Sequence, residues 1–431
     1  MKKRARRTSP RALAVTRREL MGVVGASLLA PRTLHASGEE TRKFLFVFCD
    51  GGWYPGAVFV PMFDLDVDHE EGTWLEEQYG LPFVASESRP SVTAFFQNFS
   101  NQTCVINGIE VPSIVHDRCT QMLLTGRSTT GGDDWPVILG AAREDLIMPH
   151  LVLSGPVFSG RFSDRVVRVG NDGQLSALLD GSALQASDLP VNPLSSSTAA
   201  SVSNFVQGRV SAAAASATGR RELLVASYQD ALADLGAVQA QSEQLDFVPQ
   251  SADCARDIQA DLETALNCFA AGLSRCAMVR YNGWCDQGWD THQRDWLQND
   301  NFEELFSNLN GLMQLMETMP GEKAATLAEE VTVVVCSEMG RHPRWNAWGG
   351  RDHWTTTSMM LMGAGVSGGR VIGGVDEGAT GLPVALSTGE ASEQGQRLSP
   401  SHIGATLLTM GGIDPAEFVE DAAPITAVIS T

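Results

Sequence analysis

The chain has 431 residues, of which 43% are hydrophobic, so it is long and apolar enough to form a large core and is not disordered as a whole. Its formal net charge of −20 is unevenly distributed: residues 1–36 hold nine Lys or Arg and one acid, so the remainder holds 22 basic and 50 acidic side chains, a net charge of −28. Such an acidic body excludes a nucleic-acid-binding protein, which needs a basic face, and argues against docking on an anionic membrane.

The first segment of the chain has the pattern of an export signal. Arg17 and Arg18 precede a mildly apolar run over residues 20–30, which is too short to span a bilayer. Paired arginines before a weakly hydrophobic run resemble a twin-arginine signal. We therefore expect residues 1–36 to be a signal peptide recognised by the twin-arginine export machinery, with an uncleaved anchor as the alternative. The mature protein would then be periplasmic or extracellular, without a stable membrane span.

The body of the chain alternates short apolar runs with helical patterns. Continuous apolar runs, typical of strands buried on both faces, occupy residues 44–49, 103–106, 151–153, 277–281 and 331–336. Apolar residues at three- and four-residue spacing predict helices over 91–99, 117–124, 257–273 and 302–319. This alternation predicts an α/β fold in which helices cover both faces of a mainly parallel sheet.

Residues 180–250 differ from this pattern because they are rich in Ala, Ser and Gln, with a helical pattern over 222–244. We interpret them as a mostly helical insertion within one domain spanning residues 37–431, rather than as a separate catalytic domain.

The eight cysteines contain no CxxC pair and no zinc-ribbon spacing. Cys49 and Cys336 lie in apolar runs, where buried free thiols are expected. Four others are close enough in sequence for one or two disulfides in an exported protein, although the sequence does not pair them: Cys254, Cys268, Cys276 and Cys285.

Acidic and histidine residues follow several of the predicted strands. They are Asp50 after 44–49, Asp290 and His292 after 277–281, Glu338 after 331–336, and the later pair Asp352 and His353. Each group alone could be a turn, a capping pair or a surface ion-pair network. Because functional groups gather at the carboxyl ends of strands in open α/β sheets, we expect these groups to converge. Carboxylates and imidazoles together predict a divalent metal site, with zinc, calcium and magnesium all open.

Residues 337–354 resemble a known signature. The string SEMGRHP at 337–343, Asn346, and GGRDHW at 349–354 resemble the domain-of-unknown-function 1501 family. Further matches are GWDTH at 288–292, GGRVIG at 368–373, and ATLL at 405–408 before GIDP at 412–415. That family is similar to the sulfatases and alkaline phosphatases. The resemblance covers nearly the whole chain and implies an alkaline-phosphatase-like three-layer α/β/α sandwich.

The resemblance also implies roles for the strand-end residues. It places metal ligands at Asp50, at the pair Asp290 and His292, at Glu338 where relatives have an Asp, and at Asp352 and His353. The chain departs from the sulfatases at the nucleophile, because the helix that ends in LTGR at 124–127 places His116 where they have Cys or Ser. Ordinary sulfatase chemistry is therefore not expected. We expect His116 to be a metal ligand or a general acid/base; a phosphoryl-accepting nucleophile and a plain helix-capping role remain open.

An anionic ester could approach so acidic a protein only where positive charge is concentrated. Five arginines lie near the predicted site: Arg118, Arg127, Arg341, Arg344 and Arg351. Because the planar guanidinium suits oxyanion binding, we expect Arg341 and Arg351 to act in catalysis, with Arg351 contacting the substrate or a carboxylate beside the metal. The alternative is that these arginines pair with neighbouring carboxylates. Six of the nine tryptophans lie between 284 and 354, where they either fill the core or stack on a glycan.

Two classes of function fit these features. The first is an exported metal-dependent hydrolase in which divalent ions polarise a phosphate or sulfate ester and activate water. The second is a non-catalytic exported surface or assembly protein that keeps the fold and a metal. A nucleotide-binding protein fits poorly, because no Gly-rich loop has the required strand and helix context.

Overall fold

The apolar runs of the sequence form one eight-stranded sheet in the computed structural model, which describes residues 41–169, 195–242 and 258–430. The predicted export signal at 1–36 lies outside these residues. The strand order is β12-β4-β11-β8-β1-β7-β5-β6. The strands are β1 (Lys43–Cys49), β4 (Thr103–Glu110), β5 (His150–Val152), β6 (Val166–Arg168), β7 (Cys276–Tyr281), β8 (Val331–Cys336), β11 (Thr356–Gly363) and β12 (Arg370–Ile372).

The sheet is mainly parallel, as predicted. Strand β1 lies between β7 and β8 and is parallel to both, whereas β11 runs antiparallel to its neighbours β4 and β8. All five strands expected from the sequence are present. Strands β6, β11 and β12 were not expected. The first and last of these have only three residues each, and the methionine-rich part of β11 lacks the β-branched residues that mark the longer strands.

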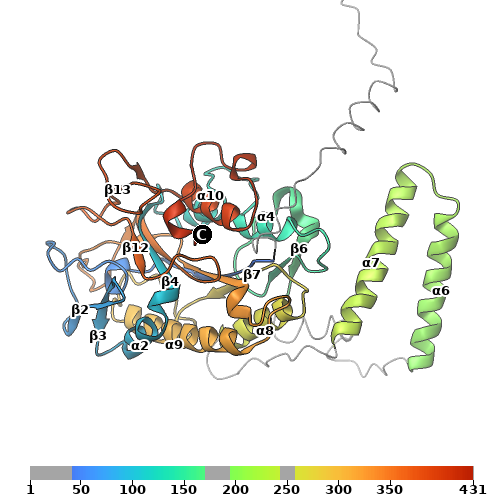
Figure 1. Cartoon of the computed structure of the whole chain (residues 1–431), viewed down its shortest axis with the longest axis horizontal. Helices are drawn as coiled ribbons and strands as arrows, with labels where there is room; N and C mark the ends of the chain where they lie inside the picture. The colour runs from blue at the N-terminus through green and yellow to red at the C-terminus, as the bar shows by residue number, and fades with distance from the viewer. Residues whose placement is uncertain (1–40, 170–194, 243–257, 431) are drawn as a thin grey trace, which may run out of the picture. The chain divides into compact units, whose positions relative to one another are not determined.

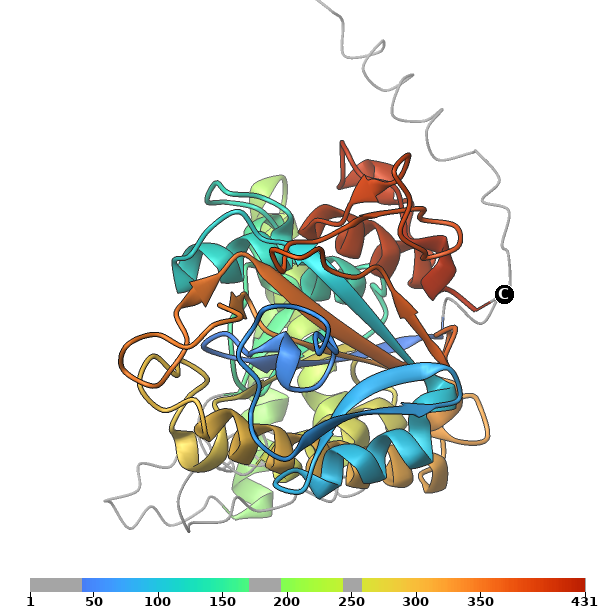
Figure 2. The ribbon, with the colours of Figure 1, turned by 90° about the vertical axis from the view of Figure 1, so that its left-hand side faces the viewer.

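Helices cover both faces of this sheet (Figures 1 and 2). Alternate residues of β1 point to opposite faces. Leu45 and Val47 pack in one core with α2, α8 and α9, while Phe44 and Phe46 pack in a second core with α3, α4 and α10. The helices are α2 (Pro90–Phe99), α3 (His116–Thr125), α4 (Trp135–Ala141), α8 (Ile258–Ala270), α9 (Leu297–Thr318) and α10 (Pro400–Met410). These two cores confirm the three-layer α/β sandwich.

The remaining elements are small pairs of strands and a pair of helices. The strand pairs are β2 (Thr73–Gln78) with β3 (Leu81–Ser86), β9 (Gly340–Arg341) with β10 (His353–Trp354), and β13 (Pro383–Val384) with β14 (Gln396–Arg397). Within the proposed insertion, the described residues form α6 (Ser196–Ala214) and α7 (Arg220–Ser242), which pack against each other. None of the helices in the described ranges is long and apolar enough to cross a membrane.

The cysteines follow the prediction only in part. Cys49 and Cys336 are buried free thiols, as expected. Cys268 and Cys276 are also buried and free, so the expectation that they form disulfides is wrong. Cys268 belongs to one core and Cys276 to the other, so the two thiols lie on opposite faces of the sheet. Cys285 is disulfide-bonded, and Cys254 lies outside the described residues.

The fold also buries His150 of β5 completely, and neither ring nitrogen has a hydrogen-bond partner among residues 41–169, 195–242 and 258–430. Burial lowers the pKa of His150 from 6.5 to about 3. The folded state therefore binds fewer protons than the unfolded state below pH 6.5, and stability falls as the pH drops through that value. Between pH 7.5 and 5.5 we expect the wild type to lose about 1.4 kcal/mol more unfolding free energy than His150→Leu. Urea unfolding at the two pH values measures this difference, and equal losses would contradict it.

Candidate metal centre

The site is built where neighbouring strands end. Strands β1, β7 and β8 are adjacent and parallel, so the loops after their carboxyl ends meet at one edge of the sheet. Asp50 directly follows β1, Glu338 closely follows β8, and Asp290 lies in the loop after β7. His116 opens helix α3 beyond β4. The predicted convergence of these segments is therefore present.

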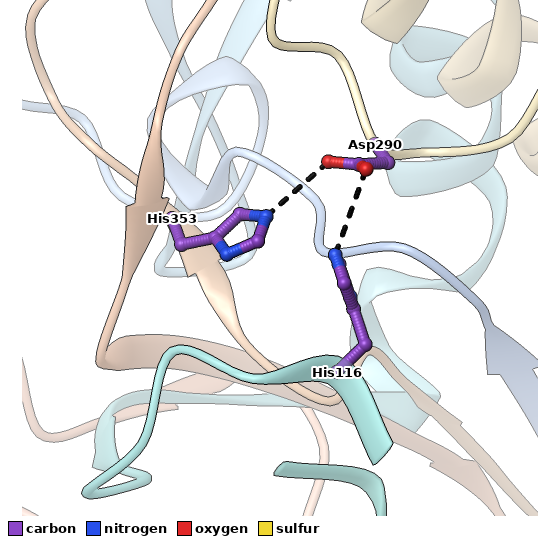
Figure 3. Close-up of side chains that lie close together, drawn as sticks. All are labelled: His116, Asp290 and His353. Carbon is purple, nitrogen blue, oxygen red and sulfur yellow. Dashed lines mark hydrogen bonds and ion pairs between the residues drawn. The ribbon is translucent and has the colours of Figure 1, made fainter. Parts of the chain in front are cut away.

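Three side chains form the centre of the site (Figure 3). His116, Asp290 and His353 each offer one ligand atom, and these atoms all lie within 4.8 Å of one another. Asp290 lies between the two rings: its Oδ2 is 3.7 Å from His116 Nε2, and its Oδ1 is 3.3 Å from His353 Nε2. A fourth ligand candidate adjoins them, because His292 Nε2 lies 3.2 Å from Asp290 Oδ1 and 2.9 Å from His353 Nε2.

Each of the three histidines has an acceptor on its other ring nitrogen. The contacts are His116 Nδ1 to Glu338 Oε1 (2.7 Å), His292 Nδ1 to Asp352 Oδ1 (3.0 Å) and His353 Nδ1 to the Ile114 carbonyl (2.7 Å). A neutral imidazole carries one proton, and these acceptors favour its placement on Nδ1. In that tautomer each Nε2 lone pair is available to bind a cation beside Asp290. Acceptors behind imidazole ligands are the usual arrangement of metal-binding histidines, so the donor set fits a divalent cation.

The charges of the site are strongly coupled. The carboxylates of Asp290 and then Glu338 raise the pKa of His116 to about 9. Burial alone would raise the pKa of Asp290, but its contacts with His116, His353 and Arg341 outweigh it and lower that pKa well below its ordinary value. Because a histidine ligand must be neutral, a bound cation would take the place of the proton that His116 otherwise holds.

Glu338 links His116 to the turn after β1. It is fully buried, and both its carboxylate oxygens accept from the Gly51 N–H, at 3.0 and 3.2 Å. Gly51 is required there because its φ is +123° and an added Cβ would lie 2.7 Å from the backbone nitrogen of Asp290. The Asp-Gly-Gly turn therefore lets the end of β1 pack directly against the loop that carries Asp290.

The predicted ligands divide into two groups. Asp290, His292 and His353 lie together with His116, whose side chain contacts Glu338 and Asp290. Glu338 and Asp352 instead hold the far nitrogens of His116 and His292.

Asp50 lies at the margin of the cluster. Its Oδ2 is 3.4 Å from an Nη1 of Arg280, and burial together with the nearby Glu338 raises its pKa. A role for Asp50 as a ligand stays a prediction.

The two signature arginines expected to act in catalysis are both buried, each with 1% of its surface exposed. Arg341 donates to Asp290 Oδ1 at 2.5 Å and to the carbonyls of Gly51, Gly52 and Arg351. Its role in this geometry is to position Asp290 and the turn after β1. Arg341 therefore pairs with a neighbouring carboxylate, which is the alternative that the sequence left open.

Arg351 is held in the same way. Its Nε donates to Asp295 Oδ2 at 3.0 Å, and its guanidinium lies 3.8 Å from the centre of the Tyr54 ring. It also donates to the carbonyls of His342 and Pro343. Arg351 therefore supports the 342–351 loop and contacts a carboxylate, whereas its contact with a substrate stays a prediction.

Arg280 is the site residue that the sequence reasoning missed. Its side chain is 43% exposed at the end of β7 and faces Asp50. The available signal was a single charged residue within the otherwise apolar run 277–281. Such an exposed guanidinium at the edge of the candidate metal centre can bind an anionic group.

Several solved structures are similar to this chain at low sequence identity. They include the PsFucS1 sulfatase from Pseudoalteromonas sp. (10% identity, covering 96% of this chain and 77% of that one, TM-score 0.41). Ps i-CgsB in complex with k-i-k-neocarrahexaose has 9% identity, coverages of 86% and 72%, and a TM-score of 0.38. The phosphonate monoester hydrolase of Agrobacterium radiobacter has 9% identity, coverages of 89% and 78%, and a TM-score of 0.34. Similarity at this level does not identify the activity of this chain.

No curated protein matches the sequence. The family described as "Protein of unknown function (DUF1501)" matches residues 41–423, which include every residue of the candidate metal centre. The resemblance seen in the signature at 337–354 is thus confirmed over most of the chain, and the protein belongs to the DUF1501 family.

Proposed function

We propose that this protein is an exported metal-dependent hydrolase of phosphate or sulfate esters that works without a covalent nucleophile. The observation that carries the proposal is the convergence of three imidazole Nε2 atoms on Asp290. His116, Asp290, His292 and His353 would hold the ion. A set of three imidazoles and one carboxylate favours zinc over calcium or magnesium, which prefer all-oxygen ligands.

The residues around the ion fit hydrolysis by water. A bound divalent ion supplies polarisation of the ester and lowers the pKa of water. Cys119 and Thr120, one turn into α3, are buried, and burial raises the pKa of the Cys119 thiol. A thiol with a raised pKa is a poor nucleophile. Arg280 is the exposed cation that would orient the anionic ester, and Asp352 would hold the His292 ring.

One observation favours the alternative, a non-catalytic exported protein that keeps the fold and a metal. Arg341 and Arg351 are both committed to carbonyls and carboxylates of the protein itself. Both arginines therefore serve structure in the metal centre and its loop. Export itself rests on the pattern of residues 1–36 and on the acidic body.

The two functions are separated by assaying the mature protein with aryl phosphates and aryl sulfates. The hydrolase predicts turnover that a chelator abolishes and added zinc restores. His116→Ala should lower this turnover by about a hundredfold or more, since it removes one imidazole from the ion. Bound metal without turnover of any ester, unchanged in His116→Ala, would instead support the non-catalytic protein.

A further inference from the structure

A pocket separate from the candidate metal centre lies beside the 342–351 loop. Its volume is about 250 Å³, and its wall comes from the turn after β1, strands β2 and β3, and the start of α9. Drug-sized ligands usually occupy pockets of about 300–1,000 Å³, so this one suits a ligand the size of a single ring. None of the candidate metal ligands lines it.

The wall of this pocket carries an unusual share of unpaired polar atoms. Eleven buried side-chain nitrogen or oxygen atoms have no hydrogen-bond partner in the described part of the chain. Four of the eleven belong to residues of this one wall: the Tyr54 hydroxyl, His69 Nε2, Arg89 Nε and Asp295 Oδ1. Tyr54 and Arg89 are themselves 6% and 1% exposed. Buried polar groups are normally paired, so this concentration of both donors and acceptors points to a polar ligand.

The formal charges of the wall cancel. Arg89 pairs with Glu70 at 2.8 Å, and Arg351 pairs with Asp295 at 3.0 Å, with all four residues lining the pocket. Neither an anion nor a cation would therefore find an unbalanced partner there. A neutral ligand with several hydroxyl groups would find both donors and acceptors.

The rim supplies an aromatic surface. Trp296 and Trp345 line the pocket and are 54% and 43% exposed. The Trp345 indole N–H is fixed by Asp295 Oδ2 at 2.5 Å, and Arg351 lies 5.3 Å from the Trp345 ring centre. An exposed indole beside a polar wall can present its apolar face to the C–H side of a sugar ring.

We propose that this pocket binds one neutral sugar ring. Its walls combine a ring-sized volume, balanced charge, unpaired donors and acceptors, and an exposed Trp296. Because it contains no candidate metal ligand, this binding is independent of the ion and of the hydrolysis proposed above.

The test is calorimetric titration of the full mature protein in excess chelator with neutral methyl glycosides of glucose, galactose, mannose and N-acetylglucosamine. We expect at least one to bind with a dissociation constant of about 1 mM or lower. The methyl glycoside of glucuronic acid and that of glucosamine, which carry one charge each, should bind about tenfold more weakly or not at all. Failure of all four neutral glycosides to bind, or tighter binding of a charged one, overturns the proposal.

Two tryptophan variants locate the binding. Trp296→Ala should weaken it by about threefold to tenfold, the worth of one aromatic stacking contact. Trp348→Ala is the matched control, because Trp348 is 75% exposed in the signature loop and does not line the pocket. Equal weakening by both variants, or binding that requires added zinc, overturns the assignment. Ester hydrolysis can fail without affecting either result, so this test and that of the proposed function are distinguishable.

Discussion

Asp290→Asn should lower the affinity of the protein for zinc by more than about a hundredfold, and chelator-sensitive ester hydrolysis should fall with the loss of bound metal. Asp290 is the carboxylate that contacts the Nε2 atoms of His116, His292 and His353. Removing its charge leaves three neutral imidazoles without a central anion. The asparagine oxygen can still accept from Arg341, so the turn after β1 should keep its partner. Zinc content per chain after dialysis against a defined free zinc concentration measures the effect.

The matched control is Asp286→Asn, in the same loop. Asp286 is exposed, and its Oδ1 accepts from the side chain of Asn282 rather than from a histidine. Its φ of +60° is a conformation that asparagine tolerates well. We expect wild-type zinc content in this variant. If Asp290→Asn also retained full zinc, the assignment of the metal centre would be wrong.

Variants of the residues behind the ligands should have smaller effects. Asp352→Asn removes the carboxylate that holds His292 Nδ1, and we expect a loss in zinc affinity of about tenfold to a hundredfold. The lowered pKa of Asp352, caused by hydrogen bonds from Asn346 and then His292, is consistent with a carboxylate that stays ionised. Zinc titration against a competing chelator measures this loss. An affinity equal to that of the wild type would place Asp352 outside the site.

The fold was predictable because its strands are buried on both faces. Residues 44–49 and 331–336 are almost entirely apolar, which is typical of strands at the centre of a covered sheet, and they form β1 and β8. Because the carboxyl ends of parallel strands meet at one edge of a sheet, Asp50, Asp290 and Glu338 were expected at the same edge. Strand β11 was not predicted because its methionines favour a helix, and its pairing with β4 and β8 on both sides outweighs that preference.

The roles of individual atoms were not predictable from the sequence. That Asp352 would hold His292, and Glu338 would hold His116, depends on contacts between segments far apart in the chain. The same holds for Arg351, whose partner Asp295 lies 56 positions away. Spacing within one loop carries no information about such pairs, so the motif identified residues of the candidate site but not which of them surround Asp290.

Arg341→Met should lower the free energy of unfolding by about 3–5 kcal/mol. The guanidinium is buried and donates to three backbone carbonyls, at Gly51, Gly52 and Arg351, as well as to Asp290. Burial lowers the pKa of Arg341, which reflects the cost of placing a charge there. The buried charge is still favourable overall, because each buried carbonyl left without a donor would cost about 1–3 kcal/mol. Urea unfolding followed by tryptophan fluorescence, in excess chelator, measures the change without a contribution from metal binding.

Arg344→Met provides the comparison within the same loop. Arg344 is 53% exposed and pairs with Asp66, which is 94% exposed, so we expect a loss below about 1 kcal/mol. The two arginines lie three positions apart, but Arg341 contacts buried carbonyls and Asp290, whereas Arg344 contacts one exposed carboxylate. If their unfolding free energies fell equally, Arg341 would contribute no more than a surface ion pair. A large loss confined to Arg341→Met would instead mean that the buried guanidinium holds Asp290 in position. The metal centre would then depend on Arg341 without any contact between Arg341 and the substrate.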